Sequence, residues 1–154
     1  MDGLGALYQE SILDHGKNPR NRGTVENVTA EALGANPNCG DRISVSVSLE
    51  GETITDVAFD GQGCAISMAS ASMMTEVVKG VEAKVAERLF SEFRRLCTEA
   101  GDVELSHDGL DGDLVEQLRV MAGVRQFPGR IKCATLSWAA LEAALQGRDQ
   151  ASSE

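Results

Sequence analysis

The clearest pattern in the chain is the alternation of apolar and polar residues between positions 42 and 49. Four apolar residues alternate there with three serines: Ile43, Val45, Val47 and Leu49 with Ser44, Ser46 and Ser48. This period of two predicts a strand with one buried face and one solvent-exposed face. Two further strands are predicted over residues 27–34 and 53–59, with Glu50-Gly51 as a hairpin turn before the third strand.

Elsewhere the apolar residues recur with a helical period. An amphipathic helix is predicted over residues 4–15, and the Gly- and Pro-containing stretch HGKNPRNRG ends it. Further helices are predicted over 65–79, 82–98 and 112–123, and from about Cys133 to Leu145. Strands that come first and helices that follow predict an α+β fold, in which a small antiparallel sheet of about three strands is covered by helices.

The length of 154 residues predicts a single domain over 1–154 with a core of its own. Aromatic residues are only 4%, so this core must be built mainly from aliphatic side chains and methionine. Segment 99–123 is predicted to be an acidic loop followed by a helix; residues 99–116 hold seven acids and no Lys or Arg. The polar tail, 147–154, is predicted to be frayed.

A formal net charge of −10 excludes nucleic acid and anionic membranes as expected partners. No apolar run approaches the ~20 residues that span a bilayer. The N-terminal residues lack the pattern of a signal peptide, which predicts a cytoplasmic protein with reduced cysteines. One short basic cluster, Lys17, Arg20 and Arg22, is either solvated surface or part of a docking surface.

Three of the four cysteines stand at the beginnings of predicted elements. Cys39 and Asp41 are two positions apart just before a strand, so an extended chain turns both side chains to the same side. They share the parity of Ile43 and therefore point toward the face that the helices cover. Cys64 and Cys133 each follow a glycine-containing segment and are predicted to open helices. A helix N-terminus lowers the pKa of a thiol and favours the thiolate.

Three thiols and one carboxylate complete a tetrahedral ligand set for zinc. Arg130 and Lys132 would add positive charge beside Cys133. The alternative is that the three cysteines are buried independently of one another, because the spacing is not that of a zinc ribbon.

The other candidate ligands have simpler interpretations. The fourth cysteine, Cys97, lies on an apolar helical stripe and is predicted to be a small core residue. His15, at a helix end, and His107, in the acidic loop, are predicted to be solvent-exposed and not to be ligands.

Four motifs occur in order along the chain: YQESILDHGKNPRNRG, NPNCGDRI, FDGQGCAISMASASMM and GRIKCATLSWAALE. Together they resemble the SufU group of the IscU/NifU-N iron–sulfur cluster assembly family. The resemblance extends from Leu7 to about Leu145. It implies a SufE/NifU-like α+β fold, in agreement with the pattern of strands and helices.

The resemblance also implies a site and a function. It places a zinc ion on Cys39, Asp41, Cys64 and Cys133, with Cys39 as the sulfur acceptor and Arg130 as a supporting residue. The protein is then a sulfurtransferase that takes persulfide sulfur from a SufS-type cysteine desulfurase. It would pass this sulfur to a downstream SUF scaffold or another acceptor.

The rival function is that of an IscU-like scaffold, on which the same four ligands would hold a transient iron–sulfur cluster. Thiolates suit both zinc and iron–sulfur clusters, so the ligand types leave this choice open. Scaffold-type members have a histidine immediately before the last cysteine, where this chain has Lys132. They also lack most of the inserted stretch, roughly 99–123, that lies between Cys64 and Cys133 here. Both differences favour the SufU group. A third possibility is a purely structural zinc site.

Overall fold

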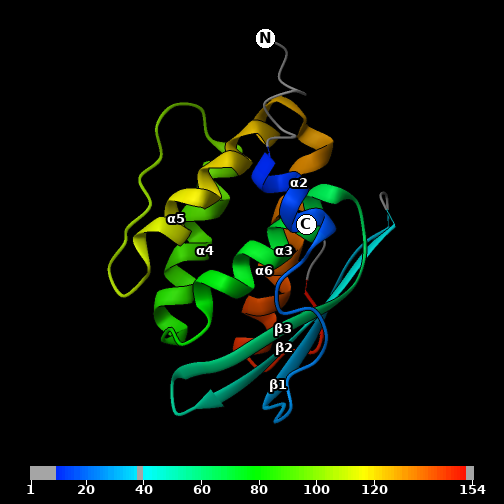
Figure 1. Cartoon of the computed structure of the whole chain (residues 1–154), viewed down its shortest axis with the longest axis vertical. Helices are drawn as coiled ribbons and strands as arrows, with labels where there is room; N and C mark the ends of the chain where they lie inside the picture. Colours follow the sequence, from blue (N-terminus) through cyan, green and yellow to red (C-terminus); the bar gives the residue numbers. More distant parts are fainter. Residues whose placement is uncertain (1–9, 38–39, 152–154) are drawn as a thin grey trace.

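A computed structural model describes residues 10–37 and 40–151. Its elements follow in the order α2 (Glu10–Lys17), β1 (Ala30–Asn36), β2 (Asp41–Glu50), β3 (Thr53–Gln62), α3 (Ala65–Val78), α4 (Ala83–Thr98), α5 (Gly112–Gln117), the 3-10 helix η1 (Leu118–Gln126) and α6 (Pro128–Leu145). The three strands form one antiparallel sheet in the order β1-β2-β3. The helices lie to one side of this sheet (Figure 1). The α+β prediction is confirmed.

The sheet turns its apolar face toward the helices. Ile43, Val45 and Val47 of β2 are fully buried, as the alternation predicts. The opposite face is not uniformly wet, because Ser46 is also buried and its Oγ accepts a hydrogen bond from the backbone N–H of Val25 at 3.2 Å. The segment before β1 therefore covers part of the outer face, and Ser46 is an exception to the predicted pattern.

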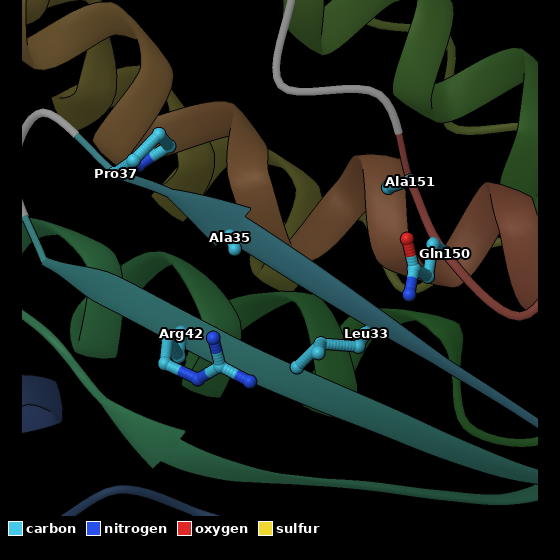
Figure 2. Close-up of a pocket in the computed structure, with 6 residues that line it drawn as sticks. All are labelled: Leu33, Ala35, Pro37, Arg42, Gln150 and Ala151. Atoms are coloured by element: carbon cyan, nitrogen blue, oxygen red, sulfur yellow. The ribbon is translucent and has the colours of Figure 1, made fainter.

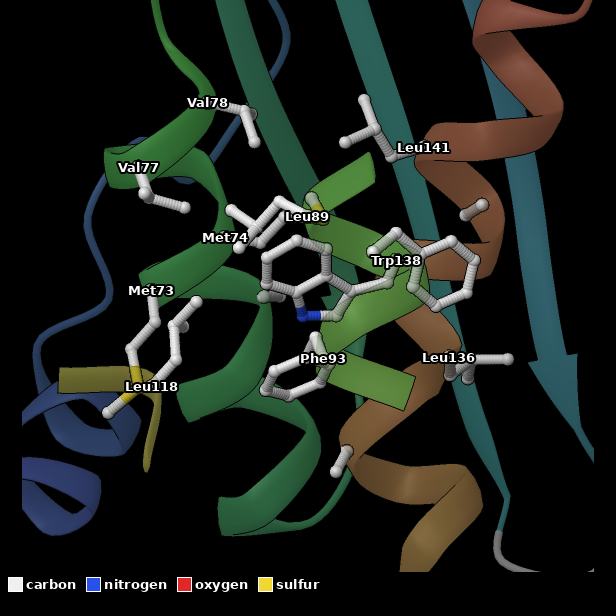
Figure 3. Close-up of a cluster of buried hydrophobic side chains, with 14 of the residues drawn as sticks. Met73, Met74, Val77, Val78, Leu89, Phe93, Leu118, Leu136, Trp138 and Leu141 are labelled. Carbon is white, nitrogen blue, oxygen red and sulfur yellow. The ribbon is translucent and has the colours of Figure 1, made fainter. Parts of the chain in front are cut away.

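Helix α3 is the centre of the molecule. It packs against β3, α2 and α6, and twelve of its fourteen residues are buried. A helix buried on nearly all sides needs small side chains so that its neighbours can approach, and α3 supplies alanines and serines. Helix α4 lies farther from the sheet and contributes Phe93, whose ring stacks on Trp138 of α6 with centroids 4.6 Å apart (Figure 3).

Segment 99–123 differs in detail from the prediction. The predicted helix over 112–123 is divided into α5, a single turn and a half, and the 3-10 helix η1. Asp111 caps α5 by accepting from the N–H groups of Asp113 and Leu114. The Arg125 guanidinium donates to the carbonyls of Leu96 and Gly101 and thereby fixes the loop to α4.

No helix of the described residues is long and apolar enough to cross a membrane.

The C-terminal residues that the structure describes are ordered against β1. The N–H of Leu33 donates to the carbonyl of Asp149, and the N–H of Ala151 donates to the carbonyl of Leu33. The prediction of a frayed tail is therefore wrong for residues 149–151. Residues 152–154 lie outside the described residues.

His15 is buried, with 1% of its surface exposed, and the prediction of a solvent-exposed histidine is wrong. Its Nδ1 lies 2.7 Å from Ser72 Oγ on α3, and its Nε2 lies 3.6 Å from a carboxylate oxygen of Glu76. The backbone N–H of Arg20 also donates to Ser72 Oγ. This network attaches α2 and the turn after it to α3. Burial lowers the pKa of His15, and the Arg20 charge lowers it further.

The free energy of unfolding should fall as the pH falls below about 6.5, the ordinary pKa of histidine. There the unfolded chain binds a proton that the folded His15 resists, because its folded pKa is lowered. This single group contributes at most about 1.4 kcal/mol per pH unit. The His15→Gln variant should show a weaker pH dependence in urea unfolding between about pH 5 and 6.5 than the wild type, because it lacks the group that titrates there in the unfolded chain. An unchanged slope in His15→Gln would contradict the assignment.

Candidate metal centre

Asp41 is the first residue of β2 and is 1% exposed, so its carboxylate is inside the protein. Its parity with Ile43 turns it toward the helices, as the sequence predicts. Both carboxylate oxygens are hydrogen-bonded: Oδ1 accepts from the backbone N–H of Cys64 at 3.1 Å, and Oδ2 accepts from Ser67 Oγ at 2.8 Å. The buried carboxylate is thus fixed by two donors from the beginning of α3.

Cys64 is the N-cap residue of α3, as predicted. Its thiol is partly exposed, and its Sγ lies 3.3 Å from Ser67 Oγ. The connection from β3 brings the backbone very close to the carboxylate. A Cβ on Gly63 would stand 2.7 Å from Asp41 Oδ1 and 3.0 Å from Ser67 Oγ. Only glycine leaves that space to the carboxylate.

Cys133 does not open a helix, and this prediction is wrong. Helix α6 begins at Pro128, so Cys133 lies in its second turn and is fully buried. Proline at the first position of a helix is favourable, because its missing N–H would have no partner there. The argument from the helix N-terminus therefore does not apply to the Cys133 thiol.

The structure brings three of the four predicted ligands together. One ligand atom from each of Asp41, Cys64 and Cys133 lies within 4.8 Å of the other two. The predicted fourth ligand, Cys39, lies outside the described residues. Arg130 is the third residue of α6 and is partly exposed, and Lys132 is exposed on the same helix.

The two thiols interact strongly. A hydrogen bond from the Cys133 thiol is the main cause that lowers the pKa of Cys64 to about 5, and the Ser67 hydroxyl contributes further. The same interaction raises the pKa of Cys133, which is also surrounded by apolar groups and faces Asp41. The interaction thus favours a thiolate on Cys64, close to the Asp41 side chain. Such a site attracts a cation.

The donor set fits zinc. Zn²⁺ binds sulfur and carboxylate oxygen in tetrahedral sites, and thiolates must be deprotonated to bind it. Asp41, Cys64 and Cys133 supply one oxygen and two sulfurs from three different elements, and each is held by its helix or strand. One further ligand would complete the four.

The remaining cysteine does not belong to this group. Cys97 is fully buried in α4, as predicted, and burial raises the pKa of its thiol to about 12. His107 is exposed, as predicted, and its Nε2 lies 2.7 Å from a Glu116 carboxylate oxygen.

Ser67 contacts two of the three candidate ligands, and the sequence analysis does not predict this. Its signal is the spacing of three from Cys64, which places both on one face of a first helical turn.

A shallow pocket lies on the outer face of the sheet. Some of its lining residues are close to Asp41 in the sequence, but the sheet separates the pocket from the candidate metal centre. Figure 2 shows its six lining residues, which are Leu33, Ala35, Pro37, Arg42, Gln150 and Ala151. Arg42 follows Asp41 directly but points to this outer face. The pocket therefore contributes no side chain to the candidate metal centre.

The model of the NifU-like N terminal domain matches residues 7–134, which include all four predicted ligands. The chain belongs to this family. It is 42% identical to the zinc-dependent sulfurtransferase SufU of Bacillus subtilis, over 90% of this chain and 89% of that protein. It is also 40% identical to the iron–sulfur cluster assembly scaffold protein IscU of Streptococcus pyogenes, over 93% of this chain and 85% of that protein.

Solved structures of the NifU-like family agree with the fold. A crystal structure from Fervidobacterium islandicum, named as a candidate iron–sulfur cluster assembly scaffold for the SUF system, is 30% identical. It superposes with a TM-score of 0.79 over 90% of this chain and 96% of its own. The N-terminal part of a NifU-like protein from Brucella abortus has a TM-score of 0.84 over 95% and 96% of the two chains. At 20% identity it supports the fold alone.

Changing Cys97 to Ser should leave the metal content unchanged and lower the free energy of unfolding by about 1–3 kcal/mol, because a hydroxyl is buried without a partner. In the folded wild type, Cys97 should resist iodoacetamide, since its thiol is buried and carries no thiolate at neutral pH. Urea unfolding, metal analysis and mass spectrometry after alkylation measure these effects. Loss of metal in the variant would identify Cys97 as a ligand.

Proposed function

We propose that this protein is a sulfur acceptor for iron–sulfur cluster assembly, which takes persulfide sulfur from a cysteine desulfurase and passes it to a later acceptor. The observation that carries this proposal is the convergence of Asp41, Cys64 and Cys133, of which Asp41 and Cys133 are buried. The support for sulfur transfer comes from the 42% identity to a zinc-dependent sulfurtransferase.

Zinc is the metal that we assign to the centre, with Cys39, Asp41, Cys64 and Cys133 as its ligands. When bound there, it would keep the thiols deprotonated and protected from oxidation. Arg130 and Lys132, on the first turns of α6, would offset part of the negative charge of three thiolates and a carboxylate.

Cys39 is the residue that we assign as sulfur acceptor. Cys133 is fully buried in α6, and a partner's persulfide cannot reach it. Cys64 caps α3, and its thiol contacts Ser67. Cys39 stands instead in the connection between β1 and β2, beside Gly40, whose φ of +72° is favourable only for glycine. The constraints on Cys64 and Cys133, together with the resemblance to the SufU group, leave the acceptor role to Cys39.

The transfer itself is a thiol exchange. The Cys39 thiolate attacks the outer sulfur of the partner's cysteine persulfide, forms a new S–S bond and releases the partner's cysteine as a thiolate. The sulfur atom moves in the sulfane state, so no external oxidant or reductant is consumed. Its rate depends on the thiolate fraction and the accessibility of Cys39.

The partner would be a SufS-type cysteine desulfurase in the cytoplasm. The basic cluster predicted as a docking surface is partly neutralised within the protein. Arg20 pairs with Asp14 at 2.7 Å, and Arg22 pairs with Asp60 at 3.4 Å, whereas Lys17 is exposed. A docking role for this cluster therefore rests more on Lys17 than on the two arginines.

A scaffold function is the second candidate, because relatives named as scaffolds match nearly as well. The same cysteines and Asp41 would then hold an iron–sulfur cluster. Lys132 favours the acceptor function, since it takes the place of the histidine that precedes the last cysteine in scaffold-type members. A scaffold would contain bound iron and sulfide, whereas the sulfur acceptor would contain zinc.

The protein should contain about one equivalent of zinc and should gain one sulfur atom, on Cys39, during incubation with a desulfurase and cysteine. Alkylation followed by peptide mass spectrometry locates the sulfur, and metal analysis of the same sample gives zinc, iron and sulfide. Cys39→Ser should abolish sulfur acceptance, whereas Cys97→Ser should retain it. Sulfur found mainly on Cys64 would refute the assignment of the acceptor. A stable iron–sulfur cluster in place of zinc would favour the scaffold function.

A further inference from the structure

Ser67 lies three residues after the helix cap Cys64, so both face the same side of the first turn of α3. It is fully buried. Its hydroxyl has one proton to donate and two lone pairs. Its Oγ lies 2.8 Å from Asp41 Oδ2 and 3.3 Å from Cys64 Sγ. The hydroxyl thus contacts two of the candidate metal ligands at once.

Three contacts form a closed ring of three residues. The Cys64 N–H donates to Asp41 Oδ1, the Ser67 hydroxyl donates to Asp41 Oδ2, and Ser67 Oγ contacts Cys64 Sγ. Asp41 comes from β2, whereas the other two residues belong to the beginning of α3. The ring therefore joins a strand to a helix at the point where both supply a ligand.

The space around the ring is closed on the side of Gly63. A Cβ there would approach Asp41 Oδ1 to 2.7 Å, so a larger residue would have to displace the carboxylate. The ring and the close approach of Gly63 together restrain the position of the Asp41 side chain.

We propose that Ser67 is a positioning residue of the metal centre, which fixes Asp41 and Cys64 as a rigid pair of ligands while exchange is left to another ligand position. This inference rests on the metal site of the proposed function and deepens it. Without the hydroxyl, Asp41 would keep one donor, and Oδ2 would become a buried acceptor without a partner. The carboxylate would then rotate away from its position beside Cys64 and bind the metal less well.

The test is a titration of the full-length metal-free protein with Zn²⁺ in competition with a chromogenic chelator. Ser67→Ala should weaken zinc binding by roughly 10- to 100-fold and accelerate zinc release to the chelator, as changes around metal ligands do. Unchanged affinity and release would overturn the proposal.

A matched control separates positioning from general stability. Ser72 is another fully buried serine of α3, and its hydroxyl contacts His15 and the N–H of Arg20 instead of a candidate ligand. Ser72→Ala should lower the melting temperature but keep the wild-type zinc affinity. An equal loss of affinity in both variants would show that Ser67 acts only through stability, and would overturn the proposal.

A double-mutant cycle tests whether Ser67 acts through Asp41. Asp41→Ala should itself weaken zinc binding, and adding Ser67→Ala should then cause little further loss, because the carboxylate that Ser67 orients is gone. If Ser67→Ala lowers the zinc affinity by the same factor in both backgrounds, the proposal is refuted.

With Co²⁺ as the probe, Ser67→Ala should change the d–d absorption and keep the intensity of the thiolate charge-transfer band.

Gly63→Ala perturbs the same carboxylate through its other oxygen, Oδ1, and serves if Ser67→Ala does not fold. Gly63 does not have a positive φ, so the backbone accepts alanine. The added Cβ should displace Asp41 Oδ1 and weaken zinc binding in a folded protein. Wild-type affinity in this variant would contradict the proposal. Failure of sulfur transfer in a wild type that binds zinc would refute the proposed function alone.

Discussion

The buried carboxylate of Asp41 is the constraint on which the arrangement of the centre depends. A charge removed from water costs several kcal/mol unless it is paired or hydrogen-bonded. Asp41 meets this requirement through the Cys64 N–H and the Ser67 hydroxyl, both at the beginning of α3. The start of β2 and the start of α3 must therefore meet. The connection through Gly63 permits this because no Cβ intervenes.

The position of Cys133, the third candidate ligand, depends on the close packing of α3 and α6. The Ser70 hydroxyl donates to the carbonyl of Ala134, and the indole N–H of Trp138 donates to Ser70 Oγ. These bonds fix how α3 and α6 are aligned at Ala134, the residue that follows Cys133. Trp138 also stacks on Phe93 in the core shown in Figure 3, and the same hydrophobic cluster includes Cys133. The packing of the core therefore also determines the position of Cys133.

The sequence predicts the features that local rules control. Alternation in β2 indicates the buried face and hence the inward direction of Asp41, and the glycines before Cys64 indicate a helix start. It fails where contacts distant in sequence decide. His15 is buried because Ser72 and Glu76, on α3, pair with it. Helix α6 begins at Pro128 and not near Cys133, because proline fits the first position of a helix although the Pro-Gly pair by itself also suits a turn. Ser67 has no pattern of its own beyond its spacing from Cys64.

The described geometry holds three positions of the candidate centre in place. Asp41 is held by two donors, Cys64 by its place as helix cap, and Cys133 by burial in α6. Moving any of these three would break hydrogen bonds or packing that also support the fold. In the proposed function, a persulfide from a partner would have to reach a thiol, and Cys133 is too deeply buried for this. The constraints on these three candidate ligands are the reason for proposing Cys39, and not Cys64 or Cys133, as the sulfur acceptor.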